Sequence, residues 1–146
     1  MKISSKALRL YAVTDRSWLK ENQTLTDSVE KAILGGVTIV QLREKNTDFE
    51  EQLSLAQELK TVCKKYNVPL IINDSVELAL KSGADGIHLG QSGGDIKKAR
   101  EILGDNAIIG ATAHNVNEAV SAFKSGADYL GCLLYTSPSP RDPKTS

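Results

Sequence analysis

The chain has 146 residues, and its 18 basic and 18 acidic residues give a formal net charge of zero. This length suits one domain with a real core, and a balanced charge without long runs of one sign argues against a nucleic-acid-binding face. No apolar segment approaches the length of a membrane span and the N-terminus has no signal-peptide core, so we expect a cytoplasmic protein that does not associate with membranes. Cys63 and Cys132 lack metal-ligand spacing and are expected to be bystander thiols.

The first half of the chain alternates strand-like and helix-like segments. A short β-prone run stops at Thr14, which predicts a strand with a polar exit. The next helix-period segment has Thr24 or Thr26 as its expected cap and stops at Gly35-Gly36. A second strand ends in the charged pair Glu44-Lys45, and the longest helix follows with Asp48 as its expected cap. The predicted elements are strands at 8–13 and 37–43 and helices at 24–34 and 48–66.

The second half continues the same alternation. Pro69 stands at the start of the third strand, where its missing N–H does least harm, and Ser75 is placed to cap the helix after that strand. Gly83 is expected to end this helix in the left-handed conformation, and Asn115 or Asn117 to cap the last helix. The predicted elements are strands at 69–73, 87–89, 107–111 and within 126–131, and helices at 76–81, 95–103 and from the Asn cap to 124.

A repeated Gly-Ala-Asp sequence before two of the strands marks one βα unit as reused. Gly83-Ala84-Asp85 before the fourth strand recurs as Gly126-Ala127-Asp128 before the sixth, so we interpret Asp85 and Asp128 as structural. Six strands alternating with five helices predict a parallel sheet covered by helices. An open doubly wound sheet and a closed barrel both fit this pattern. The unbroken repeat favours the barrel, here an incomplete (β/α)8 TIM-type α/β domain at residues 1–131, and residues 132–146 are expected to be a disordered, Pro-containing tail on a truncated chain.

Polar side chains follow the predicted strands where each strand ends. Crossover connections make the strands parallel, so these side chains should meet at one mouth, where α/β barrels build their active sites. Carboxylates and amides beside cations suit an anionic, phosphorylated substrate with Mg²⁺ rather than zinc. The side chains concerned are Thr14, Asp15, Arg16, Gln41, Arg43, Glu44, Lys45, Asn73, Asp74, His88, Gln91, Asp95, Thr112 and His114.

At these residues the sequence resembles the thiamine phosphate synthase family. The resemblance implies a (β/α)8 barrel that joins hydroxymethylpyrimidine diphosphate to hydroxyethylthiazole phosphate in thiamine biosynthesis, giving thiamine phosphate and pyrophosphate. Six stretches in the family's order and spacing make the match specific. They are Leu10–Arg16, Val40–Lys45, Ile71–Asp74, Ala84–Gln91, Ile109–His114 and Gly126–Gly131.

The resemblance assigns substrate contacts to five residues. Gln41, Arg43 and Lys45 match the segment that holds the pyrimidine and its diphosphate, and Asn73 matches a further pyrimidine contact. Thr112 stands where the family usually has a serine, so a hydroxyl is retained. Loss of pyrophosphate would leave a pyrimidinylmethyl cation that the thiazole nitrogen captures. The thiazole nitrogen is then the nucleophile, so no protein nucleophile is needed. The cationic side chains neutralise charge on the leaving group.

The resemblance also assigns the magnesium site. Asp74 matches a metal ligand, although it could instead cap the helix that begins near Ser75. The family's second carboxylate lies two residues after the Gly90-Gln91 pair, where this chain has Gly93. Asp95, two residues further on, either replaces that ligand or caps the following helix.

Three other side chains have structural alternatives. His88 lies between apolar neighbours and is interpreted as a satisfied interior histidine, and His114 as a loop or cap residue. Glu44 is expected to be a bystander or a partner of one of the cations beside it.

Two rival functions are weighed against the synthase. A thiazole tautomerase of the same superfamily shares the barrel, but the stretches at 41–45 and 73–74 speak against it. The other rival is a non-catalytic fragment that binds pyrimidine diphosphate or completes its barrel with another chain. The synthase is the leading hypothesis, but the fragment is a serious alternative because Pro138-Ser139-Pro140-Arg141 stands where the family has a Thr-x-Thr-Lys diphosphate loop. The oligomeric state is left open.

Overall fold

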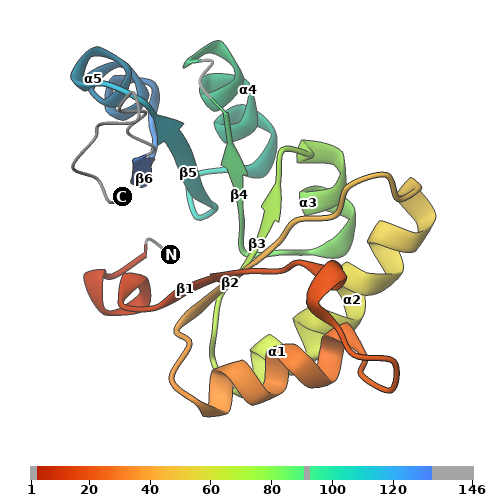
Figure 1. The fold of residues 1–146 in the computed structure, drawn as a ribbon. Coiled ribbons are helices and arrows are strands. Elements are labelled where there is room, and N and C mark those ends of the chain that lie inside the picture. The colour runs from red at the N-terminus through yellow and green to blue at the C-terminus, as the bar shows by residue number, and fades with distance from the viewer. Residues whose placement is uncertain (1–2, 91–92, 133–146) are drawn as a thin grey trace, which may run out of the picture.

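The six strands form one sheet in which every neighbour is parallel and the spatial order equals the chain order. The computed structural model describes residues 3–90 and 93–132, apart from the side chains of residues 18, 93, 94 and 132. A doubly wound sheet would reverse its strand order at a switch point, so the sequential order confirms the barrel type. The sheet curls so that its first and last strands lie on either side of one opening (Figure 1). The strands are β1 (Tyr11–Val13), β2 (Ile39–Leu42), β3 (Leu70–Asn73), β4 (Gly86–Leu89), β5 (Ile108–Ala113) and β6 (Tyr129–Cys132).

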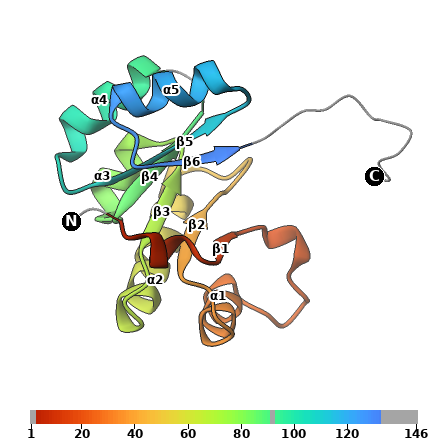
Figure 2. The same ribbon diagram turned by 90° about the vertical axis from the view of Figure 1, so that its left-hand side faces the viewer.

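Five α-helices cover the outer face of the curled sheet, as Figures 1 and 2 show. Four of them begin at the caps expected from the sequence: the side chains of Thr24, Asp48, Ser75 and Asn115 each accept a hydrogen bond from the backbone N–H three residues on. The helices are α1 (Leu25–Leu34), α2 (Phe49–Lys65), α3 (Val76–Ser82), α4 (Gly93–Leu103) and α5 (Val116–Ser125), with 3₁₀ turns at Ser5–Leu8 and Arg16–Trp18.

The first and fifth strands differ in length from the sequence-based expectation. Strand β1 is shorter, because the backbone before it forms a 3₁₀ helix that ends at Leu8. The Thr38 hydroxyl holds this turn by accepting a hydrogen bond from the Leu10 N–H and donating one to the Ala7 carbonyl. Strand β5 is longer because β6 pairs with it as far as Ala113. Thr112 therefore lies within a strand and not at its exit.

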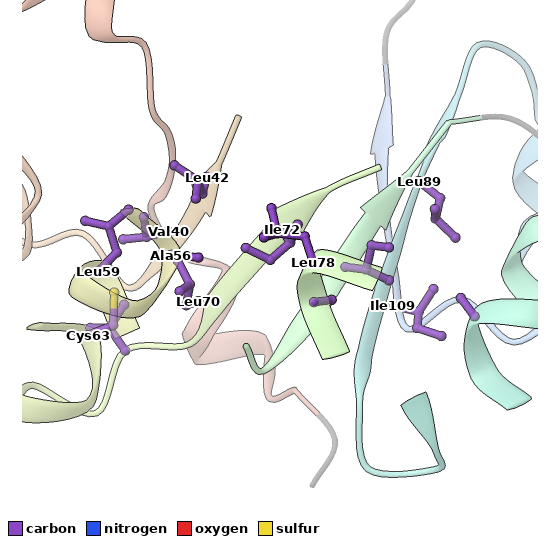
Figure 3. Close-up of a cluster of buried hydrophobic side chains, with 14 of the residues drawn as sticks. Val40, Leu42, Ala56, Leu59, Cys63, Leu70, Ile72, Leu78, Leu89 and Ile109 are labelled. Atoms are coloured by element: carbon purple, nitrogen blue, oxygen red, sulfur yellow. The ribbon is translucent and has the colours of Figure 1, made fainter. Parts of the chain in front are cut away.

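The sheet separates two apolar layers. Its outer face packs against the helices: Val40, Leu42 and Leu70 lie near Leu59 of α2, and Ile72 lies beside Leu78 of α3 (Figure 3). The inner face carries a smaller cluster built from Ile39, Ile71, Ile108 and Tyr129, with Tyr11 against it. Strand side chains alternate between these faces, which makes the inner residues the filling of the barrel lumen.

The buried thiol of Cys63 belongs to the outer layer. Burial raises its pKa to about 12, which keeps the sulfur protonated and unreactive, as expected of a bystander. No helix within residues 3–90 and 93–132 is long and apolar enough to span a membrane. The predicted tail at 133–146 lies outside the described residues.

Asp85 and Asp128 fasten each repeated turn to the preceding strand, which confirms their structural interpretation. The Asp85 carboxylate accepts from the Leu70 N–H of β3 at 2.8 Å, and the Asp128 carboxylate accepts from the Ile109 N–H of β5 at 2.9 Å. Their cationic partners differ. Lys60 stays 4.0 Å from Asp85 at an exposed position, whereas Arg100 binds the nearly buried Asp128 at 2.8 Å.

Candidate active site at the mouth of the barrel

The polar strand exits gather at one end of the barrel, because all strands run the same way. Arg43 and Lys45 follow β2, Asp74 follows β3, and Asp95 lies in the first turn of α4, which follows β4. The register pairs Asn73 of β3 with His88 of β4, so neighbouring exits stand level with each other. The residues that follow β2, β3 and β4 therefore lie at the same end of the barrel, as expected.

Two cations stand free at the exit of β2. Arg43 and Lys45 are exposed and line a hollow of about 670 Å³, together with residues 13–17 from the exit of β1. Within the part of the chain that the structure describes, neither side chain has a hydrogen bond or ion pair to protein. A pair of uncompensated cations over an open hollow suits an anionic ligand.

Glu44, between these cations, has a different partner from the one expected. Its side chain is only 5% exposed and lies 2.6 Å from the guanidinium of Arg16. The hydroxyl of Thr47 donates to the same carboxylate at 3.2 Å. The second partner of Arg16 is Glu51 on α2, at 2.9 Å. Glu44 is thus held by the exit of β1 and not by Arg43 or Lys45.

A chain of hydrogen bonds crosses the lumen below the mouth. Gln41 donates to the Tyr11 hydroxyl at 2.8 Å, and Tyr11 bonds Tyr129 on the far strand. The Tyr129 hydroxyl lies 3.1 Å from His88 Nδ1, and His88 Nε2 lies 2.9 Å from the Thr112 hydroxyl. Both ring nitrogens of His88 are thereby satisfied, which confirms the interior interpretation.

Burial sets the protonation of this chain. It lowers the pKa of His88, an effect that the nearby Asp74 carboxylate only partly opposes, so the ring is neutral at pH 7. Burial also raises the pKa values of Tyr11 and Tyr129, which keeps both phenols as hydrogen-bond donors. The lumen therefore offers neutral donors and acceptors, including the predicted substrate contacts Gln41 and Thr112.

The backbone at the exit of β3 holds Asp74 at the rim. Its φ is 63°, its N–H donates to the His88 carbonyl at 2.9 Å, and its carboxylate accepts from the Asn73 amide at 3.3 Å. The side chain of Ser75 caps α3. Asp74 is therefore not the helix cap, and its exposed carboxylate is left for another role.

A metal at this rim would have oxygen donors. Asp74 and Asp95 are both exposed, and Asp95 is the third residue of α4 and not its cap. Among the described residues no three Asp, Glu, His or Cys side chains converge on one point. Mg²⁺ usually takes one or two carboxylates and completes its shell with water and substrate phosphate, so this donor set fits Mg²⁺ and does not fit a structural zinc. Gln91 lies outside the described residues.

His114 has the capping role expected of it. Its N–H donates to the Glu118 carboxylate at 2.8 Å, while Asn115 accepts from the Glu118 N–H. The two side chains close the first turn of α5. His114 is thus part of a helix cap.

Comparison with known proteins agrees with this geometry. The family described as "Thiamine monophosphate synthase" matches residues 10–143. The chain belongs to this family. Its relatives include the thiamine-phosphate synthase of Clostridium novyi, which is 52% identical over 84% of this chain and 60% of the relative's length. That of Clostridium acetobutylicum is 50% identical over 84% of this chain and 58% of its own length.

Solved structures support the same family and fold. The thiamine phosphate pyrophosphorylase from Pyrococcus furiosus is 37% identical with a TM-score of 0.78, covering 87% of this chain and 60% of that protein. The YdjI aldolase from Escherichia coli is 13% identical with a TM-score of 0.60, which shows a shared fold alone. The chain thus spans about 60% of the length of the thiamine monophosphate synthase relatives it matches.

Tyr11 and Tyr129 are the site residues that sequence reasoning missed. Each was assigned to a strand, but their contact joins β1 to β6, which are separated by the whole sheet. The only signal was their place on the lumen-facing side of the strand alternation. That signal shows on which face of the sheet each tyrosine lies, but not which residue it contacts.

Proposed function

We propose that this chain carries the pyrimidine-diphosphate site of a Mg²⁺-dependent transferase that joins hydroxymethylpyrimidine diphosphate to hydroxyethylthiazole phosphate. The supporting observation is the rim itself: two exposed cations, which have no protein partner among the described residues, follow β2, and the amide of Asn73 and the exposed carboxylate of Asp74 lie at the end of the neighbouring strand β3. The relatives named as thiamine-phosphate synthases support the same reaction. A cytoplasmic location stays a prediction.

The residues divide into two groups by what they would bind. Arg43 and Lys45 would hold the diphosphate at the exit of β2, since charge-assisted hydrogen bonds to phosphate are strong. Asn73, Gln41 and Thr112 face the lumen and would bind the polar edge of the pyrimidine ring. Thr112 already bonds His88 and Gln41 already bonds Tyr11, so both side chains are held in place before a ligand arrives.

The rim residues would act on the leaving group. Mg²⁺, when bound by Asp74 and with Asp95 as a candidate second ligand, would neutralise part of the negative charge on the diphosphate. Arg43 and Lys45 would balance the rest as the C–O bond to pyrophosphate breaks. The pyrimidinylmethyl cation left behind would sit over the lumen and would have to be shielded from water until the thiazole nitrogen bonds to it.

A non-catalytic diphosphate-binding role is the second candidate. Among the described residues β1 and β6 each pair with one strand only, which leaves the sheet open on one side. The stretch at 138–141 also lacks the family's Thr-x-Thr-Lys pattern. We therefore expect the 146-residue chain to bind the pyrimidine diphosphate and to make little or no thiamine phosphate.

One experiment separates the two roles. The purified chain is incubated with both substrates and Mg²⁺, thiamine phosphate is measured by mass spectrometry, and binding of the pyrimidine diphosphate is measured by calorimetry. The double variant Arg43→Met/Lys45→Met serves as the site-deficient control. Robust product would establish the transferase in this chain. Equal binding by the chain and the double variant would refute the proposed site.

A further inference from the structure

The exit of β2 carries three charged residues in a row, yet only the outer two are free. Arg43 and Lys45 are exposed. The side chain of Glu44, which lies between them in the sequence, is almost fully buried. A carboxylate so close to two flexible cations would ordinarily pair with one of them. The structure shows that it does not.

Arg16 accounts for this arrangement. Its guanidinium reaches from the exit of β1 to within 2.6 Å of the Glu44 carboxylate, and it also binds Glu51 at 2.9 Å. The pKa of Arg16 is raised by its bond to Glu51 and by the charge of Glu44, so the side chain is always charged. Glu44 is thus neutralised by Arg16 within the hollow that both residues line with Arg43 and Lys45.

Hydrogen bonds hold the backbone on either side of Glu44. The Arg43 N–H donates to the Thr14 hydroxyl at 3.0 Å, and the Thr47 hydroxyl shares its proton between the Glu44 carboxylate at 3.2 Å and the Lys45 carbonyl at 3.1 Å. Asn46 follows in the left-handed conformation. Arg16, Arg43, Glu44 and Lys45 all line the same hollow, so it is the ion pair with Arg16 that keeps Glu44 from its two neighbours.

We propose that Arg16 is a positioning residue that keeps Glu44 away from Arg43 and Lys45, so that both cations remain available for the diphosphate. This inference rests on the proposed function, in which those two cations hold the diphosphate. Without Arg16, Glu44 carries an unneutralised charge at a partly buried position. That charge turns toward the nearest cations, competes with the anionic ligand and repels it.

The charge origin of the effect gives it a distinctive test. Arg16→Met is expected to weaken binding of inorganic pyrophosphate, measured by calorimetry with Mg²⁺, by about tenfold, the size of one uncompensated charge interaction near a surface. Arg16→Met/Glu44→Gln removes both charges and is expected to regain the affinity of the unmodified chain to within about twofold. Arg9→Met removes an exposed arginine outside the site and is the control for net charge.

A second measurement needs no ligand. Acetylation of the Lys45 amine by an N-hydroxysuccinimide ester, quantified by mass spectrometry, reports whether that amine is paired. We expect labelling in Arg16→Met to slow at least about threefold, because an amine paired with a carboxylate is less often in its reactive neutral form, and to recover in the double variant. Thermal unfolding of each variant shows whether the fold is intact.

The outcomes distinguish this inference from the function on which it rests. If the unmodified chain fails to bind pyrophosphate but Lys45 labelling follows the expected pattern, the proposed function fails and the role of Arg16 stands. If Lys45 labelling is unchanged in a folded Arg16→Met variant, the inference is overturned. It is also overturned if affinity falls in Arg16→Met and the double variant does not restore it, because loop damage and not charge would then be the cause.

Discussion

Asp85 and Asp128 occupy equivalent places in a repeated motif but should contribute very differently to stability. Asp128→Ala removes the carboxylate that binds Arg100 at 2.8 Å and the Ile109 N–H at 2.9 Å, with side-chain exposures of 18% for Arg100 and 9% for Asp128. Arg100 also donates to four backbone carbonyls, so it cannot swing out to water without breaking them. Breaking a buried pair of this kind costs about 3–5 kcal/mol.

Asp85→Ala should cost much less. Lys60 lies 4.0 Å away, and the two side chains are 34% and 44% exposed, so the ion pair adds only about 0–1 kcal/mol. The main loss is one hydrogen bond to the Leu70 N–H, worth about 1 kcal/mol. We therefore expect the Asp128 variant to lose about 2 kcal/mol more free energy of unfolding than the Asp85 variant.

Urea unfolding followed by circular dichroism measures this difference. For a slope near 2 kcal/mol per molar, 2 kcal/mol separates the two midpoints by about 1 M. Asp128→Asn keeps a hydrogen-bond acceptor but removes the charge. Its loss in free energy of unfolding, compared with that of Asp128→Ala, separates the contribution of the ion pair from that of the hydrogen bond. Arg100→Met, alone and with Asp128→Ala, closes the double-mutant cycle. Equal costs for the Asp85 and Asp128 variants, or no coupling between Arg100 and Asp128, would refute the reasoning.

Three further predictions concern the rim and the lumen. Asp74→Ala should weaken Mg²⁺-dependent diphosphate binding by about tenfold or more, because Asp74 is the exposed carboxylate at the exit of β3. Binding without Mg²⁺ should stay intact. Unchanged affinity by calorimetry would rule out the ligand role. The pKa of His88 is lowered in the folded chain, so its contribution to stability is present above the unfolded pKa of about 6.5 and is lost as the pH falls toward the folded value. The urea midpoint should accordingly drop from pH 7.5 to pH 5.5, and His88→Gln should remove part of that drop; an identical pH dependence in the variant would contradict it. Gly86→Ala should destabilise the chain by about 2 kcal/mol or more, since the new methyl would lie 2.0 Å from the Ile108 carbonyl oxygen. Gly90→Ala is the matched control, because its methyl meets nothing within 4 Å. Similar unfolding midpoints for the two variants would show that the sheet relaxes around the new methyl.

The sequence by itself determined the order and type of the elements. Helical periodicity and capping residues such as Asp48 and Ser75 are local signals, and the structure confirms them because a cap bonds an N–H only three residues away. The parallel sheet and the shared rim also followed from the sequence, since short helical crossovers leave the chain no other arrangement. Arg43 and Asp74 could therefore be placed at one mouth from their positions after strands.

Tertiary structure decided which side chains meet. Tyr11 and Tyr129 are separated by 118 positions, and their contact depends on how far the sheet curls, which no local pattern encodes. The partner of Glu44 was likewise decided by the fold, because the carboxylate pairs with Arg16 from another strand exit and not with either of the cations adjacent to it in sequence. The two copies of one Gly-Ala-Asp turn acquired unequal ion pairs for the same reason. A motif fixes the backbone bond it makes, but the depth of burial and the cation within reach are set by the elements packed around it.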